Sequence, residues 1–298
     1  MWINRIDTHI LPINFQYHAP KTLKEALELL AEYGDEAKVL AGGTDLLVKM
    51  KQRILEPRHI ISLRNLSELR GIREGESGLY IGAATKLREI ERSEIVAGNL
   101  PLLHAAVKAI GSVQIRNMGT IGGNLCNASP AADSAVALMA LDADLHVQSL
   151  EGERVIPIEE FFKGPGITAL KPGELLTVIY VPYPPRRYGW AFRKIGRTSL
   201  DIATVNAAVL LTLDGGRVDL CRIALGAVAP TPVRARRAEE CLTGEEPTKS
   251  LLEEASELVP EDISPITDVR GTAEYRVEAS KALVKDALML SIKRLGGG

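Results

Sequence analysis

Two glycine-rich segments carry the residue types that an anion-binding site requires. Residues 41–45 read AGGTD and residues 120–124 read TIGGN, and we expect each segment to follow an apolar strand. Glycine adopts positive φ at no steric cost and lets a ligand approach the main chain, so successive N–H groups can converge on an anion. Because a hydrogen bond to a charged acceptor contributes roughly 1.5–3 kcal/mol, about four or five of them from both segments would hold a pyrophosphate without an arginine. Neither segment contains a basic residue.

Simpler interpretations exist for the same residues. A tight turn also needs glycine, and for either segment alone this explanation is equally good. Two segments of matching chemistry favour a shared ligand. Ser129 and Pro130 fit the N-cap and first position of a helix, which would place Asp133 in its first or second turn. There the carboxylate either complements the helix dipole or accepts hydrogen bonds from sugar or ribityl hydroxyls.

Other kinds of chemical site find little support. The cysteines form no CxxC pair and the histidines have no HExxH spacing, so we expect neither a zinc site nor an iron–sulfur cluster. Cys126 is interpreted as a small buried thiol. GPGITA, residues 164–169, is rejected as a dinucleotide motif because it contains Pro165 and no helix signal follows it. RARR, residues 234–237, is expected to be a solvated helix start. A redox centre would therefore be an organic cofactor or belong to a partner.

Composition sets the general class of protein. The 298 residues are enough for two domains, and a formal net charge of −2 gives no basic footprint for nucleic acid or anionic lipid. The first residues lack the pattern of a signal peptide, and no apolar run approaches the length of a transmembrane helix. These features predict a soluble cytoplasmic protein.

Several elements are needed to position the two segments. Thr22 and Glu25 form a capping box before a helix that ends at Gly34, which suits the αL position. A strand over residues 39–41 is expected to run through the first glycine segment into a second helix. Further expected elements are strands at 59–63, from 79 and within 144–158, a helix from 101, a hairpin at 203–228 turning at 214–216, and helices at 249–258 and 275–295. VPYPPRR, residues 181–187, is expected to link two domains. The irregular mixture of strands and helices predicts an α+β fold.

With these motifs in view, the sequence resembles the FAD-binding medium subunits of the molybdenum hydroxylases, the family of xanthine dehydrogenase and aerobic carbon monoxide dehydrogenase. The resemblance extends nearly end to end, through FQYHAPKTLKEALELL, AGGTDLLVKMK, IRNMGTIGGNLCNASPAADS, FRKIGRTSLDIATVNAAV and GTAEYRVEASKALV. The paired AGGTD and TIGGN…PAAD motifs are its most specific part. The cysteine-rich insertion of the 4-hydroxybenzoyl-CoA reductase branch is absent.

The resemblance implies an FAD-binding fold of the vanillyl-alcohol-oxidase (PCMH) type. FAD would extend between two α+β lobes of residues 1–176, split near residue 60, and a C-terminal domain of residues 177–298 would close over the flavin. The implied FAD-binding residues are Leu40, Ala41, Gly42, Gly43, Thr44, Asp45, Leu46, Thr120, Ile121, Gly122, Gly123, Asn124 and Asn127 around the pyrophosphate, Asp133 at the ribityl or ribose hydroxyls, Leu176 against the isoalloxazine and Lys194 near the ring system. From the residues alone, a core role for Leu176 and a surface charge at Lys194 are the simpler interpretations.

The resemblance also implies an electron-transfer role without a catalytic acid, base or metal in this chain. Electrons would come from a large molybdopterin subunit through the two [2Fe–2S] clusters of a small subunit, and would leave the FAD for NAD+, a quinone, oxygen or another acceptor. A dimer of heterotrimers is the implied assembly. Two alternatives stay open: a stand-alone FAD-dependent oxidoreductase and an assembly module without flavin.

Overall fold

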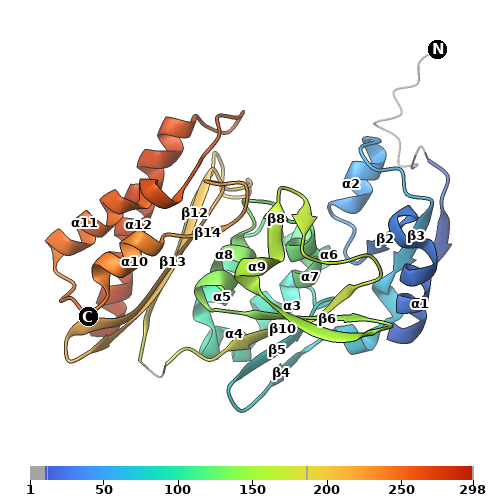
Figure 1. The fold of residues 1–298 in the computed structure, drawn as a ribbon, viewed down its shortest axis with the longest axis horizontal. Helices are drawn as coiled ribbons and strands as arrows, with labels where there is room; N and C mark the ends of the chain where they lie inside the picture. The colour runs from blue at the N-terminus through green and yellow to red at the C-terminus, as the bar shows by residue number, and fades with distance from the viewer. Residues whose placement is uncertain (1–10, 12, 186, 297–298) are drawn as a thin grey trace.

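The computed structural model describes residue 11 and residues 13–185 and 187–296. Figure 1 shows an N-terminal lobe, a middle part and a C-terminal part side by side. Each part has its own main sheet and its own cluster of buried apolar side chains, and strands and helices follow one another irregularly along the chain. The α+β fold class expected from the sequence is confirmed.

The N-terminal lobe contains a parallel three-stranded sheet in the order β1–β3–β2. Its elements are β1 Gln16–His18, α1 Leu23–Tyr33, β2 Ala37–Leu40, α2 Leu46–Lys51 and β3 His59–Ser62. The Thr22 hydroxyl accepts a hydrogen bond from the Glu25 N–H, so the Thr22 half of the predicted capping box is confirmed. The Glu25 carboxylate accepts from the Lys21 N–H rather than from that of Thr22. Gly34 has a φ of 48° but a ψ of −127°, so the predicted αL conformation there is wrong. The first glycine segment leads from β2 into α2, as predicted.

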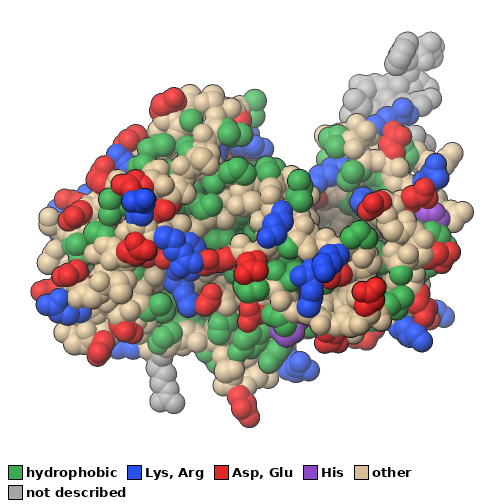
Figure 2. Space-filling model, in the orientation of Figure 1, with side chains coloured by type: hydrophobic (Ala, Val, Ile, Leu, Met, Phe, Trp, Pro, Cys, Tyr) green, Lys and Arg blue, Asp and Glu red, His purple; other side chains and the backbone are tan. Residues whose placement is uncertain are grey.

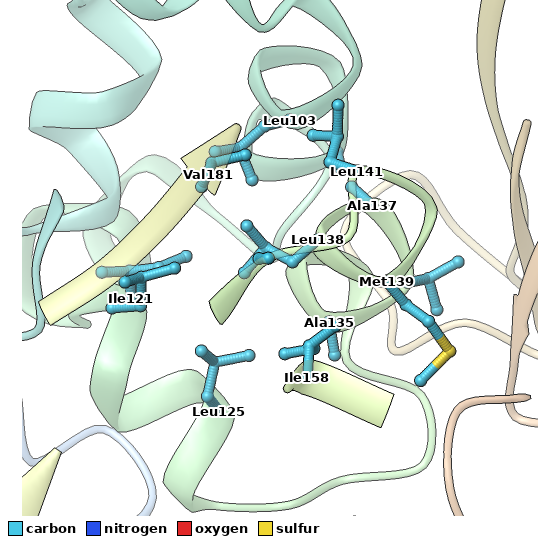
Figure 3. Packing of buried hydrophobic residues seen from close by; sticks show 14 of the residues in the cluster. Leu103, Ile121, Leu125, Ala135, Ala137, Leu138, Met139, Leu141, Ile158 and Val181 are labelled. Carbon is cyan, nitrogen blue, oxygen red and sulfur yellow. The ribbon is translucent and has the colours of Figure 1, made fainter. Parts of the chain in front are cut away.

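The middle part is an antiparallel five-stranded sheet with helices packed on one face. The strand order is β4–β5–β10–β6–β7. The strands are β4 Ile72–Glu74, β5 Gly78–Gly82, β6 Asp144–Ser149, β7 Gly152–Pro157 and β10 Leu175–Pro182, and the helices are α3 Leu87–Arg92, α4 Glu94–Asn99, α5 Pro101–Lys108, α6 Val113–Met118, α7 Ile121–Cys126, α8 Asp133–Ala140 and α9 Ile158–Phe161. Figure 3 shows how Leu103, Ile121, Leu138 and Val181 bring α5, α7, α8 and β10 into one core.

The C-terminal part is a four-stranded sheet covered by α8 on one face and by a long helix on the other. It comprises β11 Gly189–Ile195, β12 Val205–Asp214, β13 Arg217–Gly226, β14 Val233–Arg234, α10 Arg236–Leu242, α11 Lys249–Leu258 and α12 Ala273–Gly296. Asp214 pairs with Arg217 across Gly215 and Gly216, whose φ values are 55° and 85°. Two successive positive φ angles are what a tight hairpin turn needs, and the predicted hairpin is confirmed.

The second glycine segment differs from its prediction, because it is the first turn of α7 and follows α6 rather than a strand. The Thr120 hydroxyl caps this helix by accepting from the Gly123 N–H. The prediction that Ser129 and Pro130 begin a helix is also wrong. The Pro130 carbonyl accepts from Ala227 N–H at 2.8 Å, and α8 begins at Asp133 instead. A contact with a distant strand overrides the local signal here.

Two minor motifs can also be placed. GPGITA forms the hairpin of β8 Phe162–Gly164 and β9 Ile167–Thr168, which agrees with its rejection as a dinucleotide motif. RARR is only partly a solvated helix start, because the Arg234 side chain is 7% exposed and pairs with Glu239 and Glu159. The 3₁₀ helices are η1 Gly34–Glu36, η2 Leu63–Asn65, η3 Ser67–Leu69 and η4 Val259–Asp262. Among the described residues we find no helix with the length and apolarity needed to cross a membrane.

Candidate functional site

A cleft of about 780 Å³ lies where the three parts of the molecule meet. The face in Figure 2 is notched between the N-terminal lobe and the rest, and its acidic and basic side chains are interspersed. The cleft is lined by Ala41, Gly42, Gly43, Thr44, Asp45, Leu46, Thr120, Gly122, Gly123, Asn124, Asn127, Asp133, Leu176 and Lys194, which are all of the residues expected at the site except two. The exceptions are Leu40, which lies beside Gly43, and Ile121, which is fully buried in the core.

The two glycine segments are in direct contact. A Cβ atom on Gly42 would lie 2.2 Å from the Met118 carbonyl oxygen and 2.7 Å from the Cα atom of Gly119. Only glycine permits this approach between the backbone of the first segment and the backbone that precedes the second. The side chains also meet, because Asn127 donates from Nδ2 to Asp45 Oδ1 at 3.0 Å. Segments nearly eighty residues apart therefore form one wall of the cleft.

The hydrogen-bonding state of the backbone differs between the segments. Within the described part of the chain, the N–H groups of Gly42, Gly43 and Thr44 donate to no acceptor. In the second segment the amides of residues 121–124 are engaged: Ile121 with Thr85 O, Gly122 with Ala83 O, Gly123 with Thr120 Oγ1 and Asn124 with Thr120 O, at 2.8–3.1 Å. Within the described residues the Thr120 N–H donates to no acceptor. The expectation that the amides of both segments are free is therefore wrong for residues 121–124. Most of the free backbone donors come from the first segment.

Asp133, Lys194 and Asn206 form a buried polar cluster, in which Asp133 and Lys194 line the cleft. Lys194 Nζ lies 2.7 Å from Asp133 Oδ2 and donates to the Ala109 carbonyl at 2.9 Å. Asn206 Nδ2 donates to Asp133 Oδ1 at 2.6 Å. The exposed fractions are 11% for the Lys194 side chain and 5% for that of Asp133, so Lys194 is not a surface charge. Burial raises the pKa of the Asp133 carboxyl, although Lys194 and Asn206 favour its charged form.

This cluster joins the C-terminal part to the middle part. Asp133 is the first residue of α8, whereas Lys194 and Asn206 lie on β11 and β12, where they are directly paired. Because the two residues are paired in adjacent strands, both side chains reach Asp133 at the start of α8. Asp133 keeps a face toward the cleft, and Leu176, 2% exposed, supplies an apolar wall on β10. Leu176 is thus both a core residue and a cleft residue.

A second buried ion pair supports the wall beside this cluster. Arg116 on α6 donates to both carboxylate oxygens of Glu91 on α3, at 2.7 and 3.1 Å. Its Nη1 also donates to the carbonyls of Ile110 and Gly111, at 2.9 Å each, and both residues line the cleft. The hydrogen bonds from Arg116 lower the pKa of Glu91 to about 2.

Sequence reasoning missed four charged residues of the cleft, Lys38, Lys49, Glu174 and Asp201. Lys49, on α2, donates from Nζ to Asn127 Oδ1 at 2.7 Å and lines the cleft beside the first glycine segment. The sequence could have indicated Lys49, because it lies one helical turn after Asp45 on a predicted helix and therefore on the same helix face. Sequence reasoning also missed the apolar lining residues. They share no sequence motif, because they belong to separate helices and loops. They include Ile110, Ile115, Leu170, Leu200 and Ile202.

The arrangement suits an elongated ligand with an anionic middle and an apolar end. Free amides and a lysine lie at the first glycine segment, and aliphatic side chains and the Asp133–Lys194 pair line other parts of the cleft. Among the described residues, no group of three or more His, Cys, Asp or Glu side chains is placed to hold a metal ion. The groups present bind and orient a ligand by hydrogen bonds, charge and apolar contact.

Comparisons with known proteins agree on one family. Residues 13–184 match the model described as the FAD binding domain in molybdopterin dehydrogenase, and residues 190–290 match the CO dehydrogenase flavoprotein C-terminal domain. The chain is 38% identical over 279 residues to the carbon monoxide dehydrogenase medium chain of Afipia carboxidovorans, covering 94% of this chain and 97% of that one. It is 37% identical over 284 residues to the putative xanthine dehydrogenase FAD-binding subunit XdhB of Escherichia coli (strain K12), with the same coverage of 94% and 97%.

A solved structure is equally similar. The match is to a chain of carbon monoxide dehydrogenase from Hydrogenophaga pseudoflava, in a form that lacks the Mo-pyranopterin moiety of its molybdenum cofactor. The TM-score is 0.93 at 40% sequence identity, and the match covers 96% of this chain and 99% of that one. The similarity therefore extends over both chains almost completely, in sequence and in fold.

Proposed function

The chain belongs to the family of FAD-binding medium subunits of the molybdenum hydroxylases, and from this premise we propose how its cleft serves electron transfer. FAD held in the cleft would supply the redox chemistry between the [2Fe–2S] clusters of a partner and an external acceptor. The chain's own part is to bind the cofactor, orient its ring and set the charge around it. The acceptor class we propose is NAD+, a quinone, oxygen or another small oxidant.

We assign the cofactor to the cleft by the chemistry of its donors. The unbonded amides of Gly42, Gly43 and Thr44 fit the diphosphate, because a nest of N–H groups satisfies anionic oxygens without a counter-ion. Asp133 would meet hydroxyls of the ribityl or ribose group. Leu176 would lie against the isoalloxazine, and Lys194 would place positive charge near the ring, which favours its reduced form electrostatically. The other residues that the resemblance implied remain proposed ligands.

The observation that carries this proposal is the meeting of the two glycine segments in one cleft of about 780 Å³ with unbonded amides at its wall. The test is to purify the full chain without flavin, add FAD, and record flavin absorption together with thermal unfolding. A ligand that binds only the folded state raises stability in proportion to RT ln(1 + [L]/Kd). Absence of both bound flavin and stabilisation would reject the cofactor assignment.

Partners follow from the family. The relatives are medium chains and FAD-binding subunits, which implies small and large subunits beside this one. We propose further that the assembly is a dimer of heterotrimers and that it works in the cytoplasm. Affinity capture of the chain at native abundance, followed by mass photometry and cell fractionation, tests both points. Recovery of the chain alone would contradict the assembly.

The domain division is part of the same proposal. The resemblance implies an FAD-binding domain of residues 1–176, split near residue 60, and a C-terminal domain of residues 177–298. Because β10 stays in the middle sheet as far as Pro182, we propose the connection between β10 and β11 as the division. The three hydrophobic clusters support two lobes followed by a third unit.

Two other functions are less well supported. A stand-alone FAD oxidoreductase would turn over an organic substrate without partners, and a flavin-free assembly module would purify colourless and stay so after FAD is added. Relatives that match over 97% of their length are medium or FAD-binding subunits, which favours the subunit function over both.

A further inference from the structure

Lys49 is the cation of the cleft whose role nothing described so far explains. It lies on α2 in the N-terminal lobe, and its Nζ donates to Asn127 Oδ1 at 2.7 Å. Asn127 follows α7 of the middle part and donates in turn to Asp45 Oδ1 at 3.0 Å. Figure 1 places α2 and α7 in different parts of the molecule. This chain of hydrogen bonds therefore holds the ammonium where the two glycine segments meet.

Two of the three lysines that line the cleft, Lys38 and Lys49, have no carboxylate within ion-pair distance among the described residues, whereas Lys194 is ion-paired with Asp133. Lys49 differs from Lys38 in its hydrogen bond to Asn127, which holds its ammonium beside the first glycine segment. The carboxylates Glu174 and Asp201 are paired with arginines. Asp45 accepts a hydrogen bond from the Asn127 side-chain amide. Within the described residues, Lys49 has no carboxylate within ion-pair distance. An ammonium has three N–H donors, and the hydrogen bond to Asn127 uses one of them.

The neighbourhood of Lys49 indicates what those remaining donors meet. Gly42, Gly43 and Thr44 line the same end of the cleft with amides that donate to no acceptor in the described part of the chain. Free amides and an unpaired ammonium together suit a doubly charged anion such as the diphosphate of a nucleotide. In the second glycine segment the amides of residues 121–124 are all engaged within the fold, so the segment leaves a deficit of donors that Lys49 can supply.

We propose that Lys49 is a binding residue for the diphosphate, and that Asn127 holds the Lys49 ammonium in place. This inference rests on the proposed FAD function and deepens it at one residue. The Asn127 amide oxygen and nitrogen are both engaged, by Lys49 and by Asp45. The competing explanation is that Lys49 merely ties the two lobes together, in which case the anion would be held by backbone amides alone.

The test compares Lys49→Met with Lys51→Met in the full chain. Lys51 lies on the same helix and carries the same charge, but it does not line the cleft. A hydrogen bond to a charged group contributes roughly 1.5–3 kcal/mol, so we expect the FAD dissociation constant to rise about ten- to a hundredfold in Lys49→Met and less than about twofold in Lys51→Met. Lys49→Arg should keep most of the affinity. Binding in Lys49→Met should also depend less on salt.

Fragments of the cofactor separate the two explanations. If Lys49 meets the diphosphate, Lys49→Met weakens ADP binding and leaves adenosine binding unchanged. If Lys49 only ties the lobes, both ligands weaken equally and the ligand-free chain melts at a lower temperature than Lys51→Met; that result would overturn the inference. Equal FAD affinity in the two methionine variants would overturn it as well. Failure of the wild-type chain to bind FAD is a different result, which rejects the proposed function itself.

Discussion

Each glycine of the two segments has its own reason to lack a side chain. A Cβ on Gly122 would lie 2.6 Å from Ala83 Cβ and 2.7 Å from Ala83 O, so the fold itself requires this glycine. Gly123 lines the cleft, and a Cβ there would meet Thr120 Oγ1 at 2.8 Å and otherwise nothing nearer than Ala41 at 3.9 Å. Both glycines line the cleft, but only Gly122 is also required by packing against Ala83.

Gly123→Val should abolish FAD binding and leave the ligand-free fold largely intact. The new side chain would crowd the Thr120 cap, whose hydrogen bond contributes about 1 kcal/mol to helix stability. Gly122→Val is the matched control, and it should cost about 1–3 kcal/mol or more through overpacking against Ala83. Urea unfolding and flavin absorption measure the two effects. Undiminished FAD affinity in Gly123→Val would count against this cleft.

The Asp133–Lys194 pair predicts strong coupling between two parts of the molecule. Removing one member of a buried pair leaves an uncompensated charge, so Lys194→Met should destabilise the chain by roughly 3–5 kcal/mol at neutral pH. The loss should shrink as acid neutralises Asp133. Asp133→Asn combined with Lys194→Met should lose less than Lys194→Met alone. Additive losses in this double-mutant cycle, measured by denaturant unfolding, would show that the pair does not couple.

At the scale of elements, Arg116 and Glu91 hold α6 and α3 together behind the cleft. The folded-state pKa of Glu91, about 2, lies below its ordinary value of 4.5. A lowered pKa stabilises the fold at pH values above 4.5, and this contribution is lost as the pH falls toward 2. Glu91→Gln should therefore cost roughly 1.5–3 kcal/mol at pH 7 and progressively less in acid.

Glu94→Gln provides the control for this prediction, because Glu94 is exposed at the start of α4 nearby. Unfolding free energies at several pH values between 7 and 2 check it. If the difference between wild type and Glu91→Gln stays constant over that range, the ion pair is not the source of the stability.

Elements with local signals were predictable from the sequence, whereas elements set by distant contacts were not. The Thr22 cap, the turn at Gly215 and Gly216 and the helix α11 depend on neighbouring residues, and their structures agree with prediction. Glycine disfavours helix, so TIGGN gave no helix signal. The segment nevertheless begins a helix, because the N–H groups of Ile121 and Gly122 donate to the carbonyls of Thr85 and Ala83.

The same distinction applies to the site. Motifs selected most of the lining residues, because the glycines and Asp133 occur in a recognisable order along the chain. The division of labour among them depended on long-range hydrogen bonds, which spacing does not encode. Lys49 finds its partner 78 residues away, and Lys194 finds Asp133 at a separation of 61.

At the scale of the whole molecule, a group of ion pairs fixes the C-terminal part against the middle part, on α9 and just after α8. Arg222 forms an ion pair with Asp142 at 2.8 Å. Glu159 forms ion pairs with Arg234 at 2.8 Å and with Arg236 at 2.5 Å. Together with Asp133 and its partners, these contacts hold the sheet that carries Lys194 over the cleft. The position of Lys194 thus depends on an interface that lies partly outside the cleft.

Glu159→Gln tests this dependence. Glu159 is partly exposed, so we expect a loss of only about 1 kcal/mol in unfolding free energy at low salt, and a smaller loss in 1 M salt, where the screening length falls to about 3 Å. The neighbouring Glu160→Gln should change stability at neither salt concentration. FAD affinity should fall together with stability in Glu159→Gln, because a C-terminal part that is less firmly held closes less often over the cleft. A stability loss without any change in FAD affinity would mean that this interface does not govern closure.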